Sequence, residues 1–212
     1  MNKKFIAIYG GSFNPPTIAH ENIAIDILKL KEISKLIYLP VGDSYNKKSL
    51  ISAEYRYDML KIILEKLKND GLDVDINRLE IDSEKRFYTI ESLRLLKREY
   101  ESDLAFVMGT DNIKQFNSWY NPKELLNEFH FVVIEREDDD VVSLIKEDPL
   151  LRDFQDKFII LRETFYKNIS STYIRNNLYT DNEIINYIDI NVFEYIKKNK
   201  LYRGDKLWKR DF

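Results

Sequence analysis

Cysteine is absent from the 212 residues of this chain. That absence excludes disulfide bonds, cysteine-based zinc sites and a cysteine nucleophile. Histidine is almost absent as well, because only His20 and His130 occur, in two distant segments. Two separated histidines do not make a zinc site. The sequence therefore predicts no metal site built by the protein itself.

Neither a strong net charge nor a long apolar run is present. The 33 basic and 36 acidic residues leave a net charge of −3, which gives no general attraction to nucleic acid or to an anionic membrane. No apolar stretch approaches the length of a transmembrane helix, and the run that starts at Phe5 is too short for a signal-peptide core. We expect a cytoplasmic protein with no nucleic-acid and no membrane partner.

Glycine is scarce too, with six in the chain, yet two of them are adjacent at Gly10 and Gly11. They follow the apolar run 5–9 and precede an amphipathic helical pattern that carries Ile23, Ile27 and Leu30. A strand that turns through glycines into a helix is suited to hold a phosphate, since free backbone N–H groups and the helix dipole point there. Taken alone, the glycine pair fits a simple turn better.

Two polar residues at the helix start favour the phosphate interpretation. Thr17 and His20 are three residues apart, so on the first turn they share one face of the helix and can each aim a donor at an anion. The alternative is a partly buried histidine that caps a turn.

The hydrophobic pattern predicts an α/β fold. Continuous apolar runs indicate strands that are covered on both faces, as in a parallel sheet, and amphipathic patterns over 53–68 and 90–100 indicate helices between them. Residues 73–81 alternate and predict a more exposed strand. The expected buried strands are Phe5–Tyr9, Leu36–Val41, Leu104–Met108, Phe131–Ile134 and Phe158–Leu161. We expect one doubly wound domain over 1–212, with a helical portion from about 170; a homo-oligomer is left open.

Gly10 to His20 resembles the GG-x-F-(D/N)-P-P-(H/T)-x-G-H signature of the nucleotidyltransferase superfamily, and in particular of bacterial nicotinate mononucleotide adenylyltransferases. Residues 169–175, Ile-Ser-Ser-Thr-Tyr-Ile-Arg, are similar to that family's second signature, I-S-S-T-x-I-R. The resemblance covers residues 5–202, with the other family landmarks in the same order between the motifs. It implies a Rossmann-like nucleotidyltransferase fold.

Three positions depart from the family pattern. Thr17 stands where the first motif often has histidine, and Ala19 stands where it has glycine. Residues 45–48, Tyr-Asn-Lys-Lys, stand where the substrate loop often has Pro-Pro-His-Lys. Ala19 adds a methyl where the helix would approach the nucleotide, whereas the loop departure concerns the acceptor's contacts more than the ATP site.

The resemblance implies that ATP transfers its AMP group, with Mg²⁺ bound to ATP to neutralise the phosphate charge. His20 would donate to the α-phosphate, Thr17 would add a hydroxyl beside it, and Arg175 would reach the leaving pyrophosphate. Ser170 to Thr172 and the segment at Asp111 also fit ordinary helix caps, and the two roles can coexist. The ATP-binding residues implied are Gly10, Gly11, Ser12, Phe13, Gly109, Asp111, Ile169, Ser170, Ser171 and Thr172.

The acceptor site is implied by landmarks between the two motifs. Trp119 and Tyr120 would stack on a pyridine ring, although aromatic pairs are more often part of a core. Lys47 and Lys48 would meet phosphates or stay solvated. Thr89 and Arg136 complete the acceptor residues that the resemblance implies.

The function implied is an adenylyltransferase that joins ATP to nicotinate mononucleotide. One alternative is a sister transferase that uses nicotinamide mononucleotide, phosphopantetheine or a CTP-dependent acceptor. Another is a nucleotide-binding sensor without turnover, which the departures at Thr17 and Ala19 make worth testing.

Overall fold

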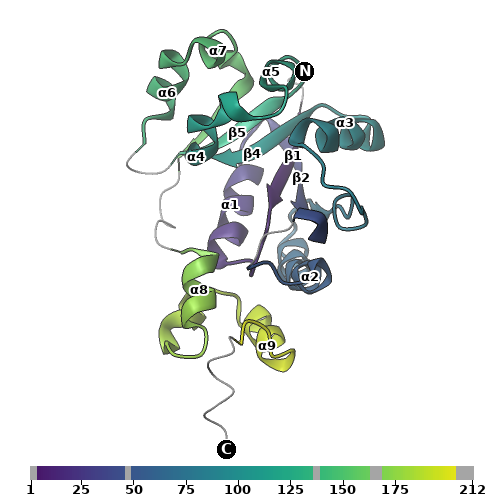
Figure 1. Cartoon of the computed structure of the whole chain (residues 1–212), viewed down its shortest axis with the longest axis vertical. Coiled ribbons are helices and arrows are strands. Elements are labelled where there is room, and N and C mark those ends of the chain that lie inside the picture. Colours follow the sequence, from purple (N-terminus) through teal and green to yellow (C-terminus); the bar gives the residue numbers. More distant parts are fainter. Residues whose placement is uncertain (1–3, 46–48, 136–138, 163–168, 204–212) are drawn as a thin grey trace, which may run out of the picture.

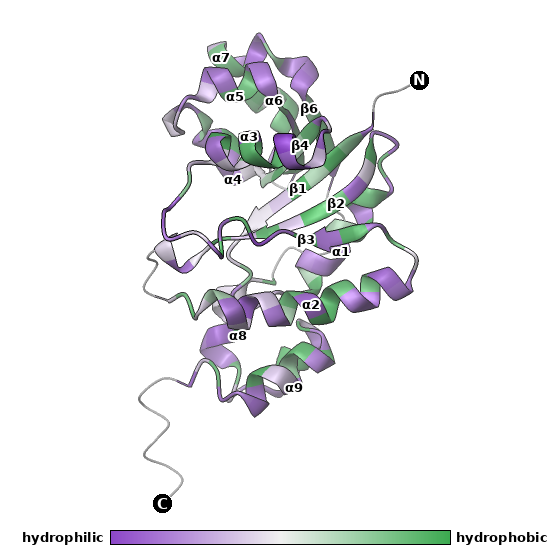
Figure 2. Cartoon of the chain, turned by 90° about the vertical axis from the view of Figure 1, so that its right-hand side faces the viewer, coloured by the Kyte–Doolittle hydropathy of each residue, from purple (hydrophilic) through white to green (hydrophobic). Residues whose placement is uncertain are grey.

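The computed structural model describes residues 4–45, 49–135, 139–162 and 169–203. These residues form a six-stranded sheet in the order β3-β2-β1-β4-β5-β6, in which every neighbouring pair is parallel. Helices cover both faces of the sheet (Figure 2). The predicted doubly wound α/β fold is confirmed.

The apolar runs form the strands because each strand is covered on both faces. The five predicted strands are all present and differ from the prediction by at most three residues at either end. The strand predicted at Phe158–Leu161 lies at the edge of the sheet and is half-buried, not buried as expected. The strands are β1 Phe5–Gly11, β2 Ile33–Pro40, β3 Val74–Ile76, β4 Leu104–Gly109, β5 His130–Glu135 and β6 Phe158–Arg162.

Helices fill the connections, as the amphipathic patterns predicted. The pattern over 53–68 corresponds to α2, which ends at Asn69, and Gly71 then adopts a φ of 81°, which glycine tolerates best. The helices are α1 Ile18–Leu28, α2 Ala53–Asn69, α3 Thr89–Tyr100, α4 Thr110–Lys114, α5 Pro122–Glu128, α6 Val141–Glu147, α7 Pro149–Arg152, α8 Ser171–Asn177 and α9 Ile190–Lys198, with short 3₁₀ turns η1 Asp43–Tyr45, η2 Phe116–Ser118, η3 Gln155–Lys157 and η4 Asn182–Asn186.

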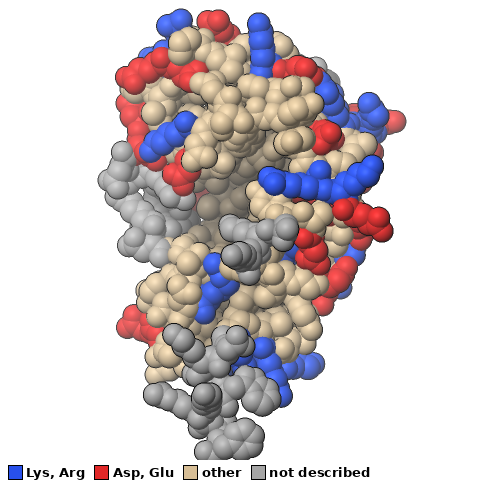
Figure 3. All heavy atoms as spheres, in the orientation of Figure 1, with Lys and Arg blue, Asp and Glu red and all other residues tan. Residues whose placement is uncertain are grey.

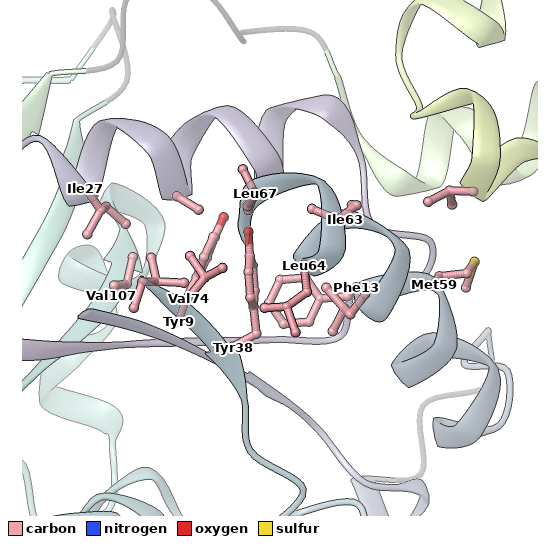
Figure 4. Close-up of a cluster of buried hydrophobic side chains, with 14 of the residues drawn as sticks. Tyr9, Phe13, Ile27, Tyr38, Met59, Ile63, Leu64, Leu67, Val74 and Val107 are labelled. Carbon is pink, nitrogen blue, oxygen red and sulfur yellow. The ribbon is translucent and has the colours of Figure 1, made fainter. Parts of the chain in front are cut away.

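The sheet separates two hydrophobic clusters. Alternate residues of β1 face opposite sides, so Ala7 and Tyr9 join one cluster and Ile8 joins the other. The first cluster packs α1, α2, α8 and α9 against the sheet, and the second packs α3 to α7 against the opposite face. In the first cluster, the rings of Tyr9 and Tyr38 stack with centroids 5.6 Å apart, next to Phe13 (Figure 4).

The C-terminal helical portion packs into the first cluster through buried side chains of α8, η4 and α9. Figure 1 shows α8 and α9 at one end of the molecule and α5, α6 and α7 at the opposite end. The division of the chain into a single domain stays a prediction. Among the described helices, none has the length and apolar character needed to cross a membrane.

One strand is shorter than the sequence predicted. The alternating segment 73–81 pairs with β2 only over Val74–Ile76, and the chain then leaves the sheet. Asn77 explains the exit because its side chain is buried and donates to Glu99 and to the hydroxyl of Tyr100, while its Oδ1 accepts the Leu79 N–H. A side chain bonded in three directions fixes a turn where the strand would continue.

The winding direction of the sheet reverses between β1 and β4. Strands β1, β2 and β3 proceed one way from this point, and β4, β5 and β6 proceed the other way. In open α/β sheets, ligands bind beyond the carboxyl ends of the strands at such a reversal. The glycine turn that follows β1 and Gly109 at the end of β4 both lie there.

Candidate active site

A pocket of about 1150 Å³ lies at the reversal point of the sheet. The first motif, the β4 end and the start of the second motif line it together with the aromatic residues that the sequence assigned to the acceptor. Figure 3 shows the molecule hollowed between its upper and lower parts, with mainly uncharged residues in the hollow. The sequence-predicted residues that line the pocket are Gly10, Gly11, Ser12, His20, Thr89, Gly109, Trp119, Tyr120, Ile169 and Ser170.

Thr17 does not line the pocket, because its side chain is fully buried at the N-cap of α1. Its Oγ1 lies 2.8 Å from Nδ1 of His20, and its backbone N–H donates to the same nitrogen at 3.1 Å. The backbone N–H of His20 donates in return to Thr17 Oγ1, 3.4 Å away, which completes a capping box. We expected this hydroxyl to meet a phosphate; in the structure it contacts the His20 ring.

These contacts determine the tautomer of His20. Nδ1 accepts the Thr17 N–H and therefore carries no proton, so the ring proton lies on Nε2. Protonation of Nδ1 would set that N–H against the Thr17 N–H. Burial lowers the pKa of His20 to about 4. His20 is therefore a neutral donor at pH 7, and it lines the pocket.

The segment between β1 and α1 is held through its backbone carbonyls. Arg56, fully buried in α2, donates to the Ser12 carbonyl at 3.0 Å and also to the carbonyls of Ile51 and Val41. Arg175 donates to the Asn14 carbonyl at 2.6 Å. A buried arginine that satisfies three carbonyls from separate segments fixes their relative positions.

Asn14 connects this segment to the C-terminal portion and to the loop before α2. Its Nδ2 donates to the Ser49 carbonyl at 2.6 Å, and its Oδ1 accepts the Tyr202 hydroxyl at 2.9 Å. Phe13, beside it, is buried with a φ of 45° and packs its ring edge-on against His20. The Phe13 side chain is therefore part of the core, so any contact of Phe13 with ATP would be through its backbone.

The second motif forms the start of α8. Ser170 Oγ caps the helix by accepting the Tyr173 N–H at 3.0 Å, while Ser171 Oγ donates to the Pro15 carbonyl at 2.8 Å. Thr172 Oγ1 accepts from Arg175 at 3.0 Å. Ile169 and Ser170 line the pocket, whereas Ser171, Thr172 and Arg175 do not. Ser171 and Arg175 tie the second motif to the first.

At the end of β4, Gly109 is the N-cap of the short helix α4 and lines the pocket. A Cβ built at Gly109 would meet no atom within 4 Å, so the space beside it is open. Asp111 is exposed on α4 and does not line the pocket. The expected cap at Thr110 or Asp111 is not observed, because Gly109 is the N-cap and Thr110 Oγ1 donates to the Ile134 carbonyl at 3.1 Å. A ribose contact of Asp111 stays a prediction.

The acceptor residues divide into three groups. Trp119 is half-buried and stacks on Phe116 with centroids 5.2 Å apart. Tyr120 is exposed and stacks on Tyr88 at 4.3 Å, just before Thr89 begins α3. Lys47, Lys48 and Arg136 lie outside the described residues.

Sequence reasoning missed several residues. Arg56 could have been found, because it is a lone charge three residues before Met59, on the face of the 53–68 pattern that carries Met59, Ile63 and Leu67. Asn14 and Tyr202 gave no such signal, since their partners are 35 and 188 residues away. Arg86 and Glu80, which also line the pocket, were not singled out either.

The described carboxylate and histidine side chains of the pocket do not form a metal site. Within the described ranges, no group of three or more His, Cys, Asp or Glu residues is arranged to hold a metal ion. The one carboxylate among the described pocket residues, Glu80, accepts a hydrogen bond from Ser92 at 2.6 Å.

Known proteins share both the sequence and the fold of this chain. Residues 8–177 match the Cytidylyltransferase-like family. A "Probable nicotinate-nucleotide adenylyltransferase" of Fusobacterium nucleatum is 38% identical over 91% of this chain and 97% of its own, and one of Acholeplasma laidlawii is 33% identical over 95% and 100%.

A solved structure of the same kind aligns over most of both chains. The Plasmodium falciparum nicotinic acid mononucleotide adenylyltransferase complexed with NaAD has a TM-score of 0.78 and 28% identity, and covers 94% of this chain and 97% of its own. The same protein complexed with APC gives a TM-score of 0.77. Our chain therefore belongs to the nicotinate-nucleotide adenylyltransferase family of the cytidylyltransferase-like nucleotidyltransferases, as its two motifs predicted.

Proposed function

We propose that this enzyme transfers AMP from ATP to nicotinate mononucleotide, giving deamido-NAD and pyrophosphate. The observation that carries the proposal is the pocket itself, which joins the glycine turn, His20 and the start of α8 to the aromatic wall formed by Trp119 and Tyr120. Relatives of full length named for this activity support it.

The reaction is an in-line displacement. A phosphate oxygen of the mononucleotide forms a bond to the α-phosphorus of ATP, and the bond from that phosphorus to the bridging oxygen breaks, so pyrophosphate leaves with the electron pair. Catalysis of such a step consists mainly of positioning and charge stabilisation. Mg²⁺, held by ATP, would supply part of the charge neutralisation.

His20 would hold a non-bridging oxygen of the α-phosphate. Its Nε2–H is the donor that remains after Thr17 has taken Nδ1. The hydrogen bond would strengthen as negative charge builds up on that oxygen, and loss of one such donor typically costs about 10²- to 10³-fold in rate. In this scheme Thr17 acts through His20, as a positioning residue.

The ATP side would be formed by the motifs, with Gly10, Gly11 and Ser12 offering backbone N–H groups and Ile169 and Ser170 closing the opposite wall. Arg175 already contacts the first motif, through Asn14. For the predicted contact with the leaving pyrophosphate, the guanidinium of Arg175 would have to turn away from the Asn14 carbonyl or donate to both groups at once.

The acid should be preferred over the amide as acceptor. The start of α3 at Thr89 lines the pocket and offers backbone N–H groups. A carboxylate only accepts hydrogen bonds, whereas a carboxamide would turn its NH₂ toward one of those donors. One donor that faces another in a desolvated site costs roughly 1–3 kcal/mol, or about tenfold to a hundredfold in kcat/KM.

One assay tests the function. The purified protein is given ATP and Mg²⁺ with nicotinate mononucleotide, nicotinamide mononucleotide or phosphopantetheine, and pyrophosphate release is measured, with CTP replacing ATP in a parallel series. We expect turnover with ATP and the acid mononucleotide. Faster turnover with another acceptor would indicate a sister transferase. Binding of ATP without pyrophosphate release would indicate a sensor. A cytoplasmic location and a homo-oligomer stay predictions.

A further inference from the structure

The described residues of the pocket offer little positive charge for the substrates it would hold. Among the described residues that line it, Arg86 is the only Lys or Arg, and Glu80 is the only Asp or Glu. ATP and a mononucleotide together bring several negative charges. A single cation in the wall of such a pocket strongly influences where the negatively charged groups of the substrates bind.

Arg86 is held in place without using its donors. The guanidinium carbon lies 4.5 Å from the centroid of the Tyr45 ring, a cation–π contact that fixes the plane of the group. Within the described part of the chain, its nitrogens donate no hydrogen bond and make no ion pair. Arg78 shows the opposite case, since its nitrogens are taken up by Glu54 and Asp82. The donors of Arg86 are therefore free for a ligand.

The position of Arg86 indicates that it would meet the acceptor and not ATP. It precedes Tyr88, which stacks on Tyr120, and Thr89, which opens α3, so it belongs to the acceptor wall. Tyr45, on which it stacks, ends the turn that follows β2. The Val41 N–H at the end of β2 donates to the Gly11 carbonyl at 3.0 Å.

This places Arg86 between the aromatic wall and the glycine turn. The mononucleotide must span that interval, because its pyridine ring would meet the aromatic wall and its phosphate would attack at the glycine turn. The ATP side would be formed by the two motifs and the end of β4, whereas Tyr45, the ring that Arg86 contacts, belongs to neither motif nor to β4.

The loops that carry this wall pack tightly together. A Cβ at Gly42 would lie 1.9 Å from the Glu80 carbonyl oxygen, so only glycine allows the turn after β2 to approach the 80–82 segment this closely. Glu80 is the negative group on the same wall, and burial raises its pKa while Arg86 acts in the opposite direction. Arg86 thus offsets the one carboxylate among the described pocket residues.

We propose that Arg86 binds the phosphate of the acceptor mononucleotide and so determines acceptor affinity. The proposal rests on the proposed function, since it takes the acceptor to be a pyridine mononucleotide. An arginine fork suits two phosphate oxygens at once, and a stacked guanidinium presents that fork at its edge.

The test compares two ligands that differ only in the phosphate. Binding of nicotinate mononucleotide and of nicotinate riboside to the full-length protein is measured by calorimetry for the wild type and for Arg86→Gln, Arg86→Lys and Lys85→Gln. Lys85 is the matched control, because it is exposed, carries the same charge one residue earlier and does not line the pocket. Melting temperatures verify that each variant is folded.

We expect Arg86→Gln to weaken mononucleotide binding about tenfold or more, as for loss of a hydrogen bond to a charged group. Riboside binding should change less than about twofold, since the neutral sugar offers no phosphate to lose. Arg86→Lys should fall between the wild type and Arg86→Gln, because the charge stays and the fork is lost. Lys85→Gln should match the wild type for both ligands.

Three results would overturn the proposal. In the first, Arg86→Gln binds the mononucleotide as tightly as the wild type does. In the second, Arg86→Gln weakens binding of the mononucleotide and of the riboside equally, which would assign Arg86 to the ring or its carboxylate. In the third, Lys85→Gln weakens binding as much as Arg86→Gln does, which would leave only an effect of general surface charge. Failure of the proposed function looks different. In that case the wild type would bind the mononucleotide, with its Arg86 dependence intact, yet release no pyrophosphate with ATP.

Discussion

Replacing Thr17 by valine separates a positioning role from a direct phosphate contact. Valine has nearly the same shape, so it fits the fully buried position, but it removes the hydroxyl that lies 2.8 Å from His20 Nδ1. The Thr17 backbone N–H to the same nitrogen, at 3.1 Å, is retained. The variant therefore keeps the tautomer of His20 and loses one of the two contacts that hold its ring.

The magnitude follows from that single contact. One neutral hydrogen bond contributes about 0.5–1.5 kcal/mol, so Thr17→Val should lower kcat about two- to tenfold. Stability should fall by about 1 kcal/mol because the N-cap acceptor of α1 is also lost. Loss of the His20 donor itself should cost about 10²- to 10³-fold. Thr17→Ser keeps the hydroxyl and should stay close to the wild type.

The assay is a double-mutant cycle on kcat, measured by pyrophosphate release at saturating ATP and acceptor, with urea unfolding to verify stability. If Thr17 acts only through the His20 ring, Thr17→Val should have no further effect once His20 is alanine. If its hydroxyl contacts phosphate, the two losses should multiply. An unchanged loss from Thr17→Val in the His20→Ala background would refute the positioning role.

Three further predictions concern His20, Arg175 and Trp119. Because burial lowers the pKa of His20 to about 4, kcat should show no inflection from this residue between about pH 5.5 and 8.5. Between this folded-state pKa and the ordinary value of 6.5 in the unfolded chain, the unfolded state binds one more proton, so the free energy of unfolding should rise with pH from 4 to 6.5. When the pH is lowered from 7 to 4.5, the free energy of unfolding of the wild type should fall by about 2 kcal/mol more than that of His20→Gln, as measured by urea unfolding. Arg175→Lys should lower kcat/KM for ATP about tenfold, since an ammonium cannot replace the fork that contacts Asn14 and Thr172; full activity would make Arg175 dispensable. Trp119→Ala should raise KM for the mononucleotide more than KM for ATP, and equal effects would contradict its place in the acceptor wall.

The strands and the glycine turn could be predicted from the sequence because they depend on neighbours in the chain. The run 5–9 is apolar on both faces of a central strand, and the glycines follow it directly. Thr17 and His20 were placed on one helix turn, and they do meet there. Spacing could not tell whether their donors faced a ligand or each other, because that depends on the burial of Thr17.

Contacts between distant segments could not be predicted. Arg56 reaches Ser12 across 44 residues, Arg175 reaches Asn14 across 161, and Tyr202 reaches Asn14 across 188. Local periodicity carries no information about such pairs. The strand predicted over 73–81 was too long for the same reason, since the partners of Asn77 on α3 are 22 and 23 residues away.

The distant contacts explain why the second motif must accompany the first. Arg175 and Ser171 satisfy the carbonyls of Asn14 and Pro15, and Arg56 satisfies that of Ser12, so three successive parts of the first motif depend on α2 and α8. Each carbonyl would otherwise face a buried environment without a donor, which costs about 1–3 kcal/mol. The hydrogen bonds from Arg56, Ser171 and Arg175 come from residues that do not line the pocket. The second motif therefore contributes to the proposed phosphate site in the absence of any nucleotide, because it holds the backbone of the first motif in place.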